Sequence, residues 1–165
     1  MSTPSLTYVP PSSSDRSPNL QTALAFIEAC NNWYSNPDGT VAVEQTLDLF
    51  DESLQHLVLP KSLQRPALNK NDYTVYFTGM LHLLKGFKAT VHEVIESTAG
   101  NSVVIHASSV GLGVSGAPYA NEYMLVFHMI PSNDPGVLPK ILSVKEFVDS
   151  KLSVDFFQEE RRRAA

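Results

Sequence analysis

The side chains of this chain that could move protons are concentrated between Tyr119 and Asp149. This stretch reads as two long strands, Tyr119–Ile130 and Lys140–Asp149, rich in β-branched, aromatic and long apolar residues. Polar and ionisable residues are set inside these strands: Asn121, Glu122, His128, Glu146 and Asp149. Burying an unpaired carboxylate costs several kcal/mol. Strands that carry such groups among apolar neighbours are therefore candidates for lining a pocket.

Histidines and tyrosines elsewhere in the chain widen this set. The complete set of candidates is His56, Tyr73, His106, Asn121, Glu122, Tyr123, His128, Glu146 and Asp149. Histidine and carboxylate side chains that share an apolar cavity are the groups that general acid/base chemistry uses. For any single member, the simpler interpretation is a hydrogen-bonded strand residue or a surface residue. The functional hypothesis rests on several such groups lying on neighbouring strands.

The alternation of side chains along a strand separates these candidates into faces. On the last strand Leu142, Val144, Glu146 and Val148 share one face, while Ile141, Ser143, Lys145, Phe147 and Asp149 share the other. The first face is more apolar, which predicts that Glu146 points inward and Asp149 outward unless a β-bulge shifts the register. On the preceding strand, Asn121 and Tyr123 face away from Glu122. The sequence leaves open which of these two sets lines the cavity.

Composition and charge narrow the class of protein. The 165 residues suit one domain, and 43% hydrophobic with 18% charged residues is typical of a soluble globular protein. The net charge of −5 argues against nucleic acid as the main partner. The single cysteine, Cys30, cannot form an internal disulfide, which predicts a reducing, cytoplasmic location. No apolar run approaches the ~20 residues of a transmembrane helix, and no secretory signal is recognisable.

The organisation of the chain follows from its periodicity. Residues 1–18 are rich in Ser and Pro and are expected to form a flexible tail, with one domain over residues 19–165. Helices are predicted at Leu20–Tyr34, Thr40–Ser53, Asn69–Leu84 and Ser150–Arg162, with Asn19 capping the first and Asn36–Gly39 ending it. Strands are predicted at Leu54–Leu59, Phe87–Ser97, Asn101–Val114, Tyr119–Ile130 and Lys140–Asp149. This order of elements indicates an α+β fold in which helices pack on a four-strand antiparallel meander.

Two short motifs do not support the function that their spelling suggests. Gly111–Gly116 fits GxGxxG, but Pro118 and the alternating strand after it exclude the helix that a dinucleotide site needs, so a Gly-rich hairpin is predicted. His92-Glu93 begins like a zinc-protease motif, but Glu96 stands where its second histidine would be. No histidines have metal-ligand spacing, and we expect neither a metal nor another cofactor.

Three segments carry a resemblance to a known family. They are His56 with Leu59-Pro60 and Ser62-Leu63, then Tyr119–Tyr123, then Glu146–Ser150. Over roughly Leu20 to Phe157 the chain resembles the SnoaL-like proteins of fungal secondary-metabolite clusters, which include small meroterpenoid isomerases and cyclases of the NTF2-like superfamily. The resemblance implies a cone of three N-terminal helices packed on a strongly curved antiparallel sheet. It also implies a cofactor-free enzyme, usually a homodimer, that rearranges, cyclises or hydrolyses a bulky polyketide or terpenoid.

The resemblance also assigns roles to residues by position. It implies proton transfer by His56, Glu122 and Asp149, and it implies that Asn121, Tyr123 and Glu146 face or support the substrate. Tyr73 and His106, from the wider candidate set, complete the expected substrate-binding residues. If His56 relays a proton, a nearby carboxylate should orient its ring and stabilise the imidazolium. One departure from the meroterpenoid enzymes is that Leu49–Asp51 occupies the region where an arginine is expected.

Three hypotheses on function follow. The first is an acid/base isomerase or cyclase acting on a hydrophobic metabolite. The alternative is a non-catalytic small-molecule-binding or dimerisation module, and a third is a structural partner bound through its sheet. Both faces of Tyr119–Ile130 are apolar, which predicts a homodimer formed through the outer face of the sheet. The substrate and the reaction within the isomerase, cyclase and hydrolase classes are left open.

Overall fold

The computed structural model describes residues 8–35, 40–97 and 99–164. The predicted tail 1–18 lies partly outside these residues, and the predicted helix stop Asn36–Gly39 lies wholly outside them. Ahead of the domain, Ser13–Asp15 forms a single 3₁₀ turn. None of the helices in the described ranges is both long and apolar enough to cross a membrane.

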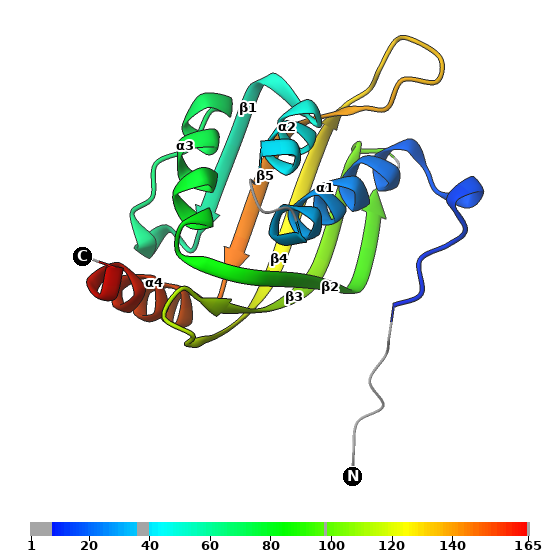
Figure 1. The fold of residues 1–165 in the computed structure, drawn as a ribbon. Helices are drawn as coiled ribbons and strands as arrows, with labels where there is room; N and C mark the ends of the chain where they lie inside the picture. Colours follow the sequence, from blue (N-terminus) through cyan, green and yellow to red (C-terminus); the bar gives the residue numbers. More distant parts are fainter. Residues whose placement is uncertain (1–7, 36–39, 98, 165) are drawn as a thin grey trace.

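One curved sheet of five strands organises the molecule (Figure 1). The strands are β1 (Phe50–Leu59), β2 (Leu84–Ser97), β3 (Ser102–Gly113), β4 (Pro118–Ile130) and β5 (Lys140–Val148), in the spatial order β1-β5-β4-β3-β2. The predicted meander of β2 to β5 is antiparallel throughout. The expectation of an antiparallel sheet is wrong at one edge, because β1 pairs with β5 in parallel. Strand β1 is also longer than predicted, since the preceding helix ends at Asp48 rather than near Ser53.

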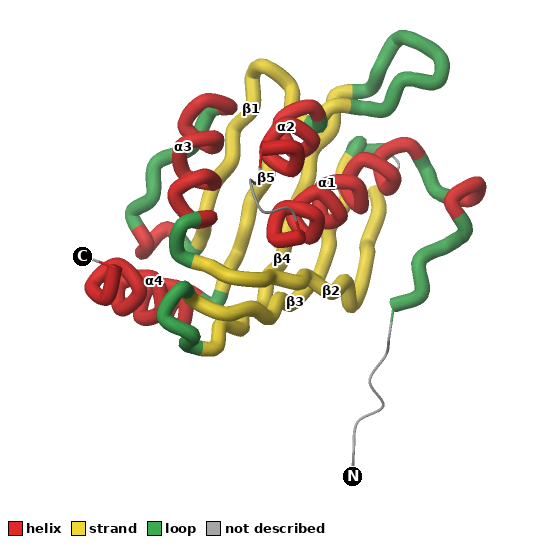
Figure 2. Tube along the Cα trace, viewed as in Figure 1, coloured by secondary structure: helices red, strands yellow, loops and turns green. Residues whose placement is uncertain are grey.

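Four α-helices lie in the described residues: α1 (Pro18–Ser35), α2 (Thr40–Asp48), α3 (Lys70–Leu81) and α4 (Ser150–Ala164) (Figure 2). Helix α1 is capped by Ser17, whose Oγ accepts from the Leu20 N–H at 3.0 Å, and not by Asn19. The reason is Pro18, which has no N–H to offer and suits the first helical position. Helix α3 starts after Asn69, whose side chain accepts from the Asp72 N–H. It ends at Leu81, because Leu84 already belongs to β2.

Helix α1 packs across the concave face of the sheet. Its Leu20, Ala23, Phe26 and Ile27 recur at helical spacing and are all buried. The Phe26 ring meets those of Phe50 and Phe127 at centroid distances of 6.0 and 5.4 Å. Burying a large apolar side chain stabilises the fold by about 1.5–3 kcal/mol, so this contact is a principal source of the stability of the core. The Asn31 amide then fixes α1 to β2, accepting from the Ala89 N–H at 2.7 Å and donating to the Ala89 carbonyl at 3.1 Å.

The curvature of the sheet comes from irregular pairing of β2 with β3. The register shifts between Lys85 and Phe87 and again between Val91 and Glu93, and such bulges bend a strand. Gly86 occupies the first shift with φ of 64°, and a Cβ on Gly111 would lie 2.5 Å from its carbonyl oxygen. Gly111 therefore allows the backbones of β2 and β3 to approach each other closely. The GxGxxG segment forms the predicted hairpin.

Helix α4 closes one end of the sheet, beside the β3–β4 turn (Figure 1). Tyr119 of β4 contacts the rings of Phe156 and Phe157 at centroid distances of 4.8 and 5.7 Å. The fully buried Glu160 carboxylate accepts hydrogen bonds from the backbone N–H and the hydroxyl of Ser115. A Cβ on Gly113 would lie 2.5 Å from that carboxylate, so glycine is required there. These contacts hold α4 where its inner side can border a cavity.

Candidate active site

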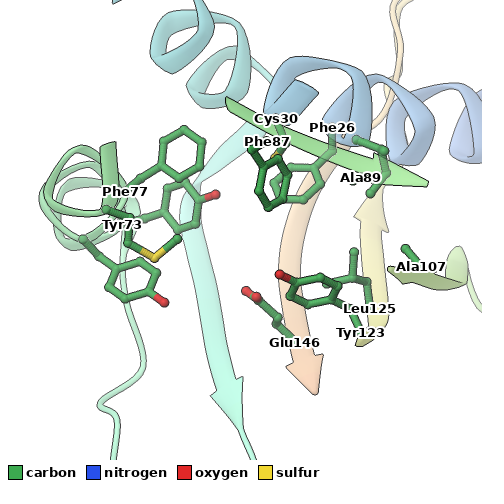
Figure 3. A pocket seen from close by; sticks show the side chains of 13 residues that line it. Phe26, Cys30, Tyr73, Phe77, Phe87, Ala89, Ala107, Tyr123, Leu125 and Glu146 are labelled. Carbon is green, nitrogen blue, oxygen red and sulfur yellow. The ribbon is translucent and has the colours of Figure 1, made fainter. Parts of the chain in front are cut away.

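A cavity lies between the concave face of the sheet and helices α1 and α3 (Figure 3). Its empty volume, counted together with the solvent space at its opening, is about 640 Å³. The lining residues are Phe26, Ile27, Cys30, Tyr73, Tyr76, Phe77, Met80, Phe87, Ala89, Ala107, Tyr123, Leu125 and Glu146. Glu146 is the only carboxylate among them. This inner cavity is therefore an apolar chamber with a single acidic group.

A second, more polar hollow adjoins the first toward α4. It has an empty volume of about 460 Å³ and is lined by Val58, Leu63, Arg65, Tyr76, Met80, Tyr119, Tyr123, Glu146, Val148, Ser153, Val154 and Phe157. The two hollows share Tyr76, Met80, Tyr123 and Glu146. Glu146 therefore lies where the apolar chamber meets the polar one, and we call the second hollow the mouth because the exposed Arg65 borders it.

The Glu146 carboxylate is held by His56. The Nε2 atom of His56 lies 2.7 Å from Glu146 Oε2, across the parallel pairing of β1 with β5. The histidine side chain is 1% exposed and that of Glu146 is 20% exposed. Main-chain hydrogen bonds between His56 and Leu68, at 2.9 and 2.8 Å, cover the outer edge of β1. The predicted inward direction of Glu146 is thus confirmed.

The environment of the His56 ring indicates which nitrogen carries its proton. Within the described residues, the buried Nδ1 has no hydrogen-bond partner, and the ring packs against Tyr73 at a centroid distance of 4.9 Å. An N–H at Nδ1 would be a buried donor without an acceptor, which is costly. We therefore assign the ring proton to Nε2, where it is donated to Glu146.

A chain of hydroxyl groups lies beside Glu146. Tyr123 OH is 2.9 Å from Ser109 Oγ and 2.9 Å from Tyr119 OH, and Figure 3 shows Tyr123 and Glu146 extending their polar ends into the same space. Burial raises the pKa of Tyr123, and the neighbouring Tyr119 and the Glu146 charge raise it further. Burial also raises the pKa of Tyr119, although its hydrogen bonds oppose that shift. Both phenols therefore stay protonated and can donate hydrogen bonds.

Cys30 lines the apolar chamber but is poorly suited to nucleophilic chemistry. Burial raises the pKa of its thiol, and the Glu146 charge raises it further. The thiolate, which is the nucleophile, is thereby disfavoured at neutral pH.

Asn121 links the strand of the tyrosines to α4. Its amide nitrogen donates to Ser153 Oγ at 2.7 Å and to Tyr119 OH at 3.1 Å. Its carbonyl oxygen accepts from the backbone N–H of Glu122 and of Asp149. Asn121 is buried with all these groups satisfied, so it positions Tyr119 and α4.

Glu122 and His106 lie on the convex outer face of the sheet, where Glu122 points away from Asn121 and Tyr123 as predicted. His106 Nε2 is 2.7 Å from Glu122 Oε1, and these side chains are 31% and 69% exposed. The His106 ring meets that of His92 at 5.2 Å, and His92 is hydrogen-bonded to Ser108. Glu122 lines neither the inner cavity nor the mouth.

Asp149 and His128 also lie away from the cavity. Asp149 precedes α4, and its Oδ1 accepts from the Leu152 N–H at 3.2 Å, as a helix cap does. His128 Nδ1 is 2.8 Å from Ser102 Oγ. The structure thus brings together His56, Tyr73, Tyr123 and Glu146 with Asn121 behind them, but it does not bring Glu122, His106 or Asp149 to them. Within the described ranges, no group of three or more His, Cys, Asp or Glu side chains is placed to hold a metal ion.

Some residues of the site were not among the sequence candidates. They are Tyr119, Ser109, Tyr76, Arg65 and Ser153. Strand alternation could have identified Tyr119, which shares a face with Asn121 and Tyr123, and the pairing of Ser109 with Asn121 could have added Ser109. Arg65 carries no such signal, because it lies in the irregular connection between β1 and α3.

The fold has clear counterparts among solved structures. BvnE pinacolase from Penicillium brevicompactum is 24% identical, with a TM-score of 0.71 over 95% of this chain and 98% of that chain. AusH from Aspergillus nidulans is 23% identical, with a TM-score of 0.65 over 86% and 88%. An NTF2-like protein from Burkholderia pseudomallei is 12% identical, with a TM-score of 0.67 over 86% and 98%.

No family model and no curated protein matches the chain. The structural counterparts agree with the resemblance that the sequence motifs carry, and they cover nearly the whole described domain. The chain therefore has the NTF2-like fold, which it shares with these fungal and bacterial proteins.

Proposed function

We propose that this protein is a cofactor-independent acid/base isomerase or cyclase acting on a bulky hydrophobic polyketide or terpenoid intermediate of secondary metabolism. The observation that carries the proposal is Glu146, a lone carboxylate aimed into an apolar chamber and held by a buried histidine. A carboxylate fixed in such surroundings is poorly hydrated, which makes it an effective base toward a bound substrate. The name of its structural neighbour BvnE, a pinacolase, supports a rearrangement.

Glu146 is the proton carrier in this mechanism. Its carboxylate takes a proton from an acidic C–H or O–H of the substrate, and the electron pair so released drives double-bond shift, ring closure or bond migration. The carboxylic acid of Glu146 then returns the proton to another atom of the product. No proton is gained or lost overall, so the reaction needs no co-reactant.

The tyrosine chain stabilises charge on the substrate. A substrate oxygen that becomes negative next to Glu146 can accept a hydrogen bond from Tyr123, whose hydroxyl is backed by Tyr119 and Ser109. Removing one such preorganised donor from an enzyme costs typically about 10²–10³-fold in turnover.

His56 acts here as a positioning residue. Its Nε2–H holds one oxygen of Glu146, which leaves the other oxygen directed at the substrate. Glu122 and Asp149, which the family resemblance implies for proton transfer, line neither chamber. The proposal therefore assigns proton transfer to Glu146.

The test uses the intermediate that accumulates when the gene is deleted in the producing organism. Purified protein should convert it without added metal or cofactor, and Glu146→Gln should slow turnover by about 10²–10⁴-fold. Glu122→Gln, which changes a carboxylate on the outer face, is the matched control and should keep its turnover. Equal turnover by Glu146→Gln and the wild type would refute the assignment.

The alternative is a binding or dimerisation module of the same fold. A module would bind the intermediate unchanged, and Glu146→Gln would alter affinity without any chemistry to lose. The same incubation separates the two hypotheses, since only the enzyme produces a new compound.

We also propose that the protein is a homodimer through the outer face of the sheet. Val110, Leu112, Met124 and Phe147 lie on β3, β4 and β5 with 40–60% of their surface exposed. Met124 and Phe147 lie beside the exposed His106–Glu122 pair, and these four apolar side chains are left largely uncovered by the described part of the chain.

A further inference from the structure

The charge on the walls changes along the cavity. The inner chamber has no basic residue in its lining, whereas the mouth has Arg65. Tyr76 and Glu146 line both chambers, and Arg65 lines the mouth alone. A ligand that fills the cavity therefore meets an apolar wall, then a carboxylate, then a guanidinium.

Arg65 is available to a ligand. It follows the 3₁₀-helix Lys61–Leu63 and a left-handed Gln64, and it precedes Pro66, so its backbone is held in a defined turn. Its side chain is exposed, and it makes no ion pair or hydrogen bond with the described residues. A guanidinium carries five donors in a fixed plane that matches a carboxylate.

A second arginine acts electrostatically on Tyr76, although it lines neither chamber. In the run of three arginines on α4, Arg162 and Arg163 pair with Glu159, while Arg161 makes no ion pair within the described residues. Burial and the Glu146 charge raise the pKa of Tyr76, and Arg65 and Arg161 both act in the opposite direction. Both guanidinium groups are thus close enough to influence a phenol in the wall of the mouth.

From these features we propose that the ligand of this cavity is an amphipathic acid. Its apolar body fills the inner chamber, and its carboxylate, or an equally acidic enol oxygen, binds Arg65 at the mouth. This inference rests on the proposed function for the identity of the cavity as the substrate site, and it adds the class of substrate and its orientation.

The position of Glu146 restricts how the acid can bind. A ligand carboxylate next to Glu146 would be repelled, whereas one at Arg65 is attracted and keeps contact with water. The anionic end therefore remains at Arg65, and a neutral part of the ligand reaches Glu146. Arg65 would in this way select the face of the substrate that undergoes proton transfer.

The test is a binding measurement with a matched pair of probes, 2-naphthoate and its neutral amide 2-naphthamide, by titration calorimetry at neutral pH. Charge-assisted hydrogen bonds are the stronger ones, so the wild type should bind the acid about 10-fold more tightly than the amide. Arg65→Gln should abolish that preference while leaving the affinity for the amide unchanged. Lys61→Gln removes the same charge from an exposed residue outside the cavity lining and should keep the preference.

Several results would overturn the inference. They are equal affinity of the wild type for acid and amide, an equal loss for both probes in Arg65→Gln, and a loss in Lys61→Gln as large as that in Arg65→Gln. Failure of both probes to bind at millimolar concentration would also overturn it, because the cavity would then not accept an aryl acid. The measurement needs no turnover, and Glu146→Gln should still prefer the acid. A failure of the proposed chemistry is therefore distinguishable from a failure of the anion site.

Discussion

Two histidine–glutamate pairs in this protein have the same nitrogen–oxygen distance of 2.7 Å but differ in their surroundings. His56 and Glu146 join β1 to β5 on the concave side, with side chains 1% and 20% exposed. His106 and Glu122 join β3 to β4 on the convex side, with side chains 31% and 69% exposed. The first pair borders an enclosed apolar chamber, and the second faces an open surface.

The comparison shows that contact distance does not identify a site. Water competes for the outer pair and screens it, so an exposed pair of this kind contributes about 0–1 kcal/mol. The inner pair has little water around it, and its interaction is correspondingly stronger. Glu146 also lines a cavity under α1 and α3 in which a substrate could replace water, whereas the hollows that Glu122 lines are open to solvent. Enclosure, and not the residue types, separates the candidate base from a surface ion pair.

The largest expected difference between the pairs is in base strength toward a neutral probe. 5-Nitrobenzisoxazole opens its ring when a base removes one proton, so it reports a carboxylate in an apolar cavity without knowledge of the natural substrate. Glu146→Gln should reduce the rate by about 10²-fold, in line with the usual contribution of a general base. Glu122→Gln should leave the rate within a factor of two, and a comparable loss in that variant would remove the distinction between the pairs.

Removing the histidine should also lower the free energy of unfolding more at the inner pair than at the outer pair. His56→Ala leaves a partly buried carboxylate without its donor and opens space beside Tyr73, at a cost of about 2–4 kcal/mol in the free energy of unfolding. His106→Ala should change it by no more than about 0.5 kcal/mol, as at an exposed site. Urea unfolding of the two variants gives both values. Similar costs would mean that enclosure does not strengthen the inner pair.

The apolar residues around the outer pair should instead affect dimer formation. If the convex face is a dimer interface, Met124→Glu places a charge among like apolar residues of the second copy and should yield a monomer. Val75→Glu, at a 73% exposed position on α3, introduces the same charge elsewhere and should leave the dimer intact. Light scattering at micromolar concentration measures both masses. A monomeric wild type would contradict the proposal directly.

The smallest expected effect concerns Glu160, which holds α4 beside the mouth. The hydroxyl and then the backbone N–H of Ser115 lower the pKa of this carboxyl below its unfolded value. Its contribution to stability is therefore present above the unfolded pKa and is lost as the pH falls through the folded pKa. The stability difference between wild type and Glu160→Gln, measured by urea unfolding at several pH values, should shrink on acidification. A difference that stays constant with pH would exclude this role.

The sequence by itself determined the local features of this protein. Period-two alternation located the four strands of the meander, and helical spacing located the buried face of α1 with Phe26. Asn69 capped its helix as its residue type predicts, and the glycines after β3 formed a hairpin. Alternation also placed Glu146 inward and set Asn121 and Tyr123 opposite Glu122. These features depend on residues close together in the chain, which is the range over which such patterns carry information.

Alternation failed where the pairing is irregular. Ile141 and Val144 are both fully buried although alternation assigns them to opposite faces. The cause is a register shift next to the pairing of His128 with Ser143. Such a shift depends on the partner strand, and no local signal in β5 announces it.

The tertiary structure alone decided the site. His56 and Glu146 are 90 residues apart and meet because β1 adds to the sheet in parallel beside β5. Arg65 reaches the mouth because the connection after β1 folds back along that strand, through the pairing of Leu68 with His56. Which of two identical histidine–glutamate pairs is enclosed depends on where α1 and α3 cover the sheet. Burial is a property of the whole packed chain, because it requires surfaces from segments far apart in sequence to exclude water together.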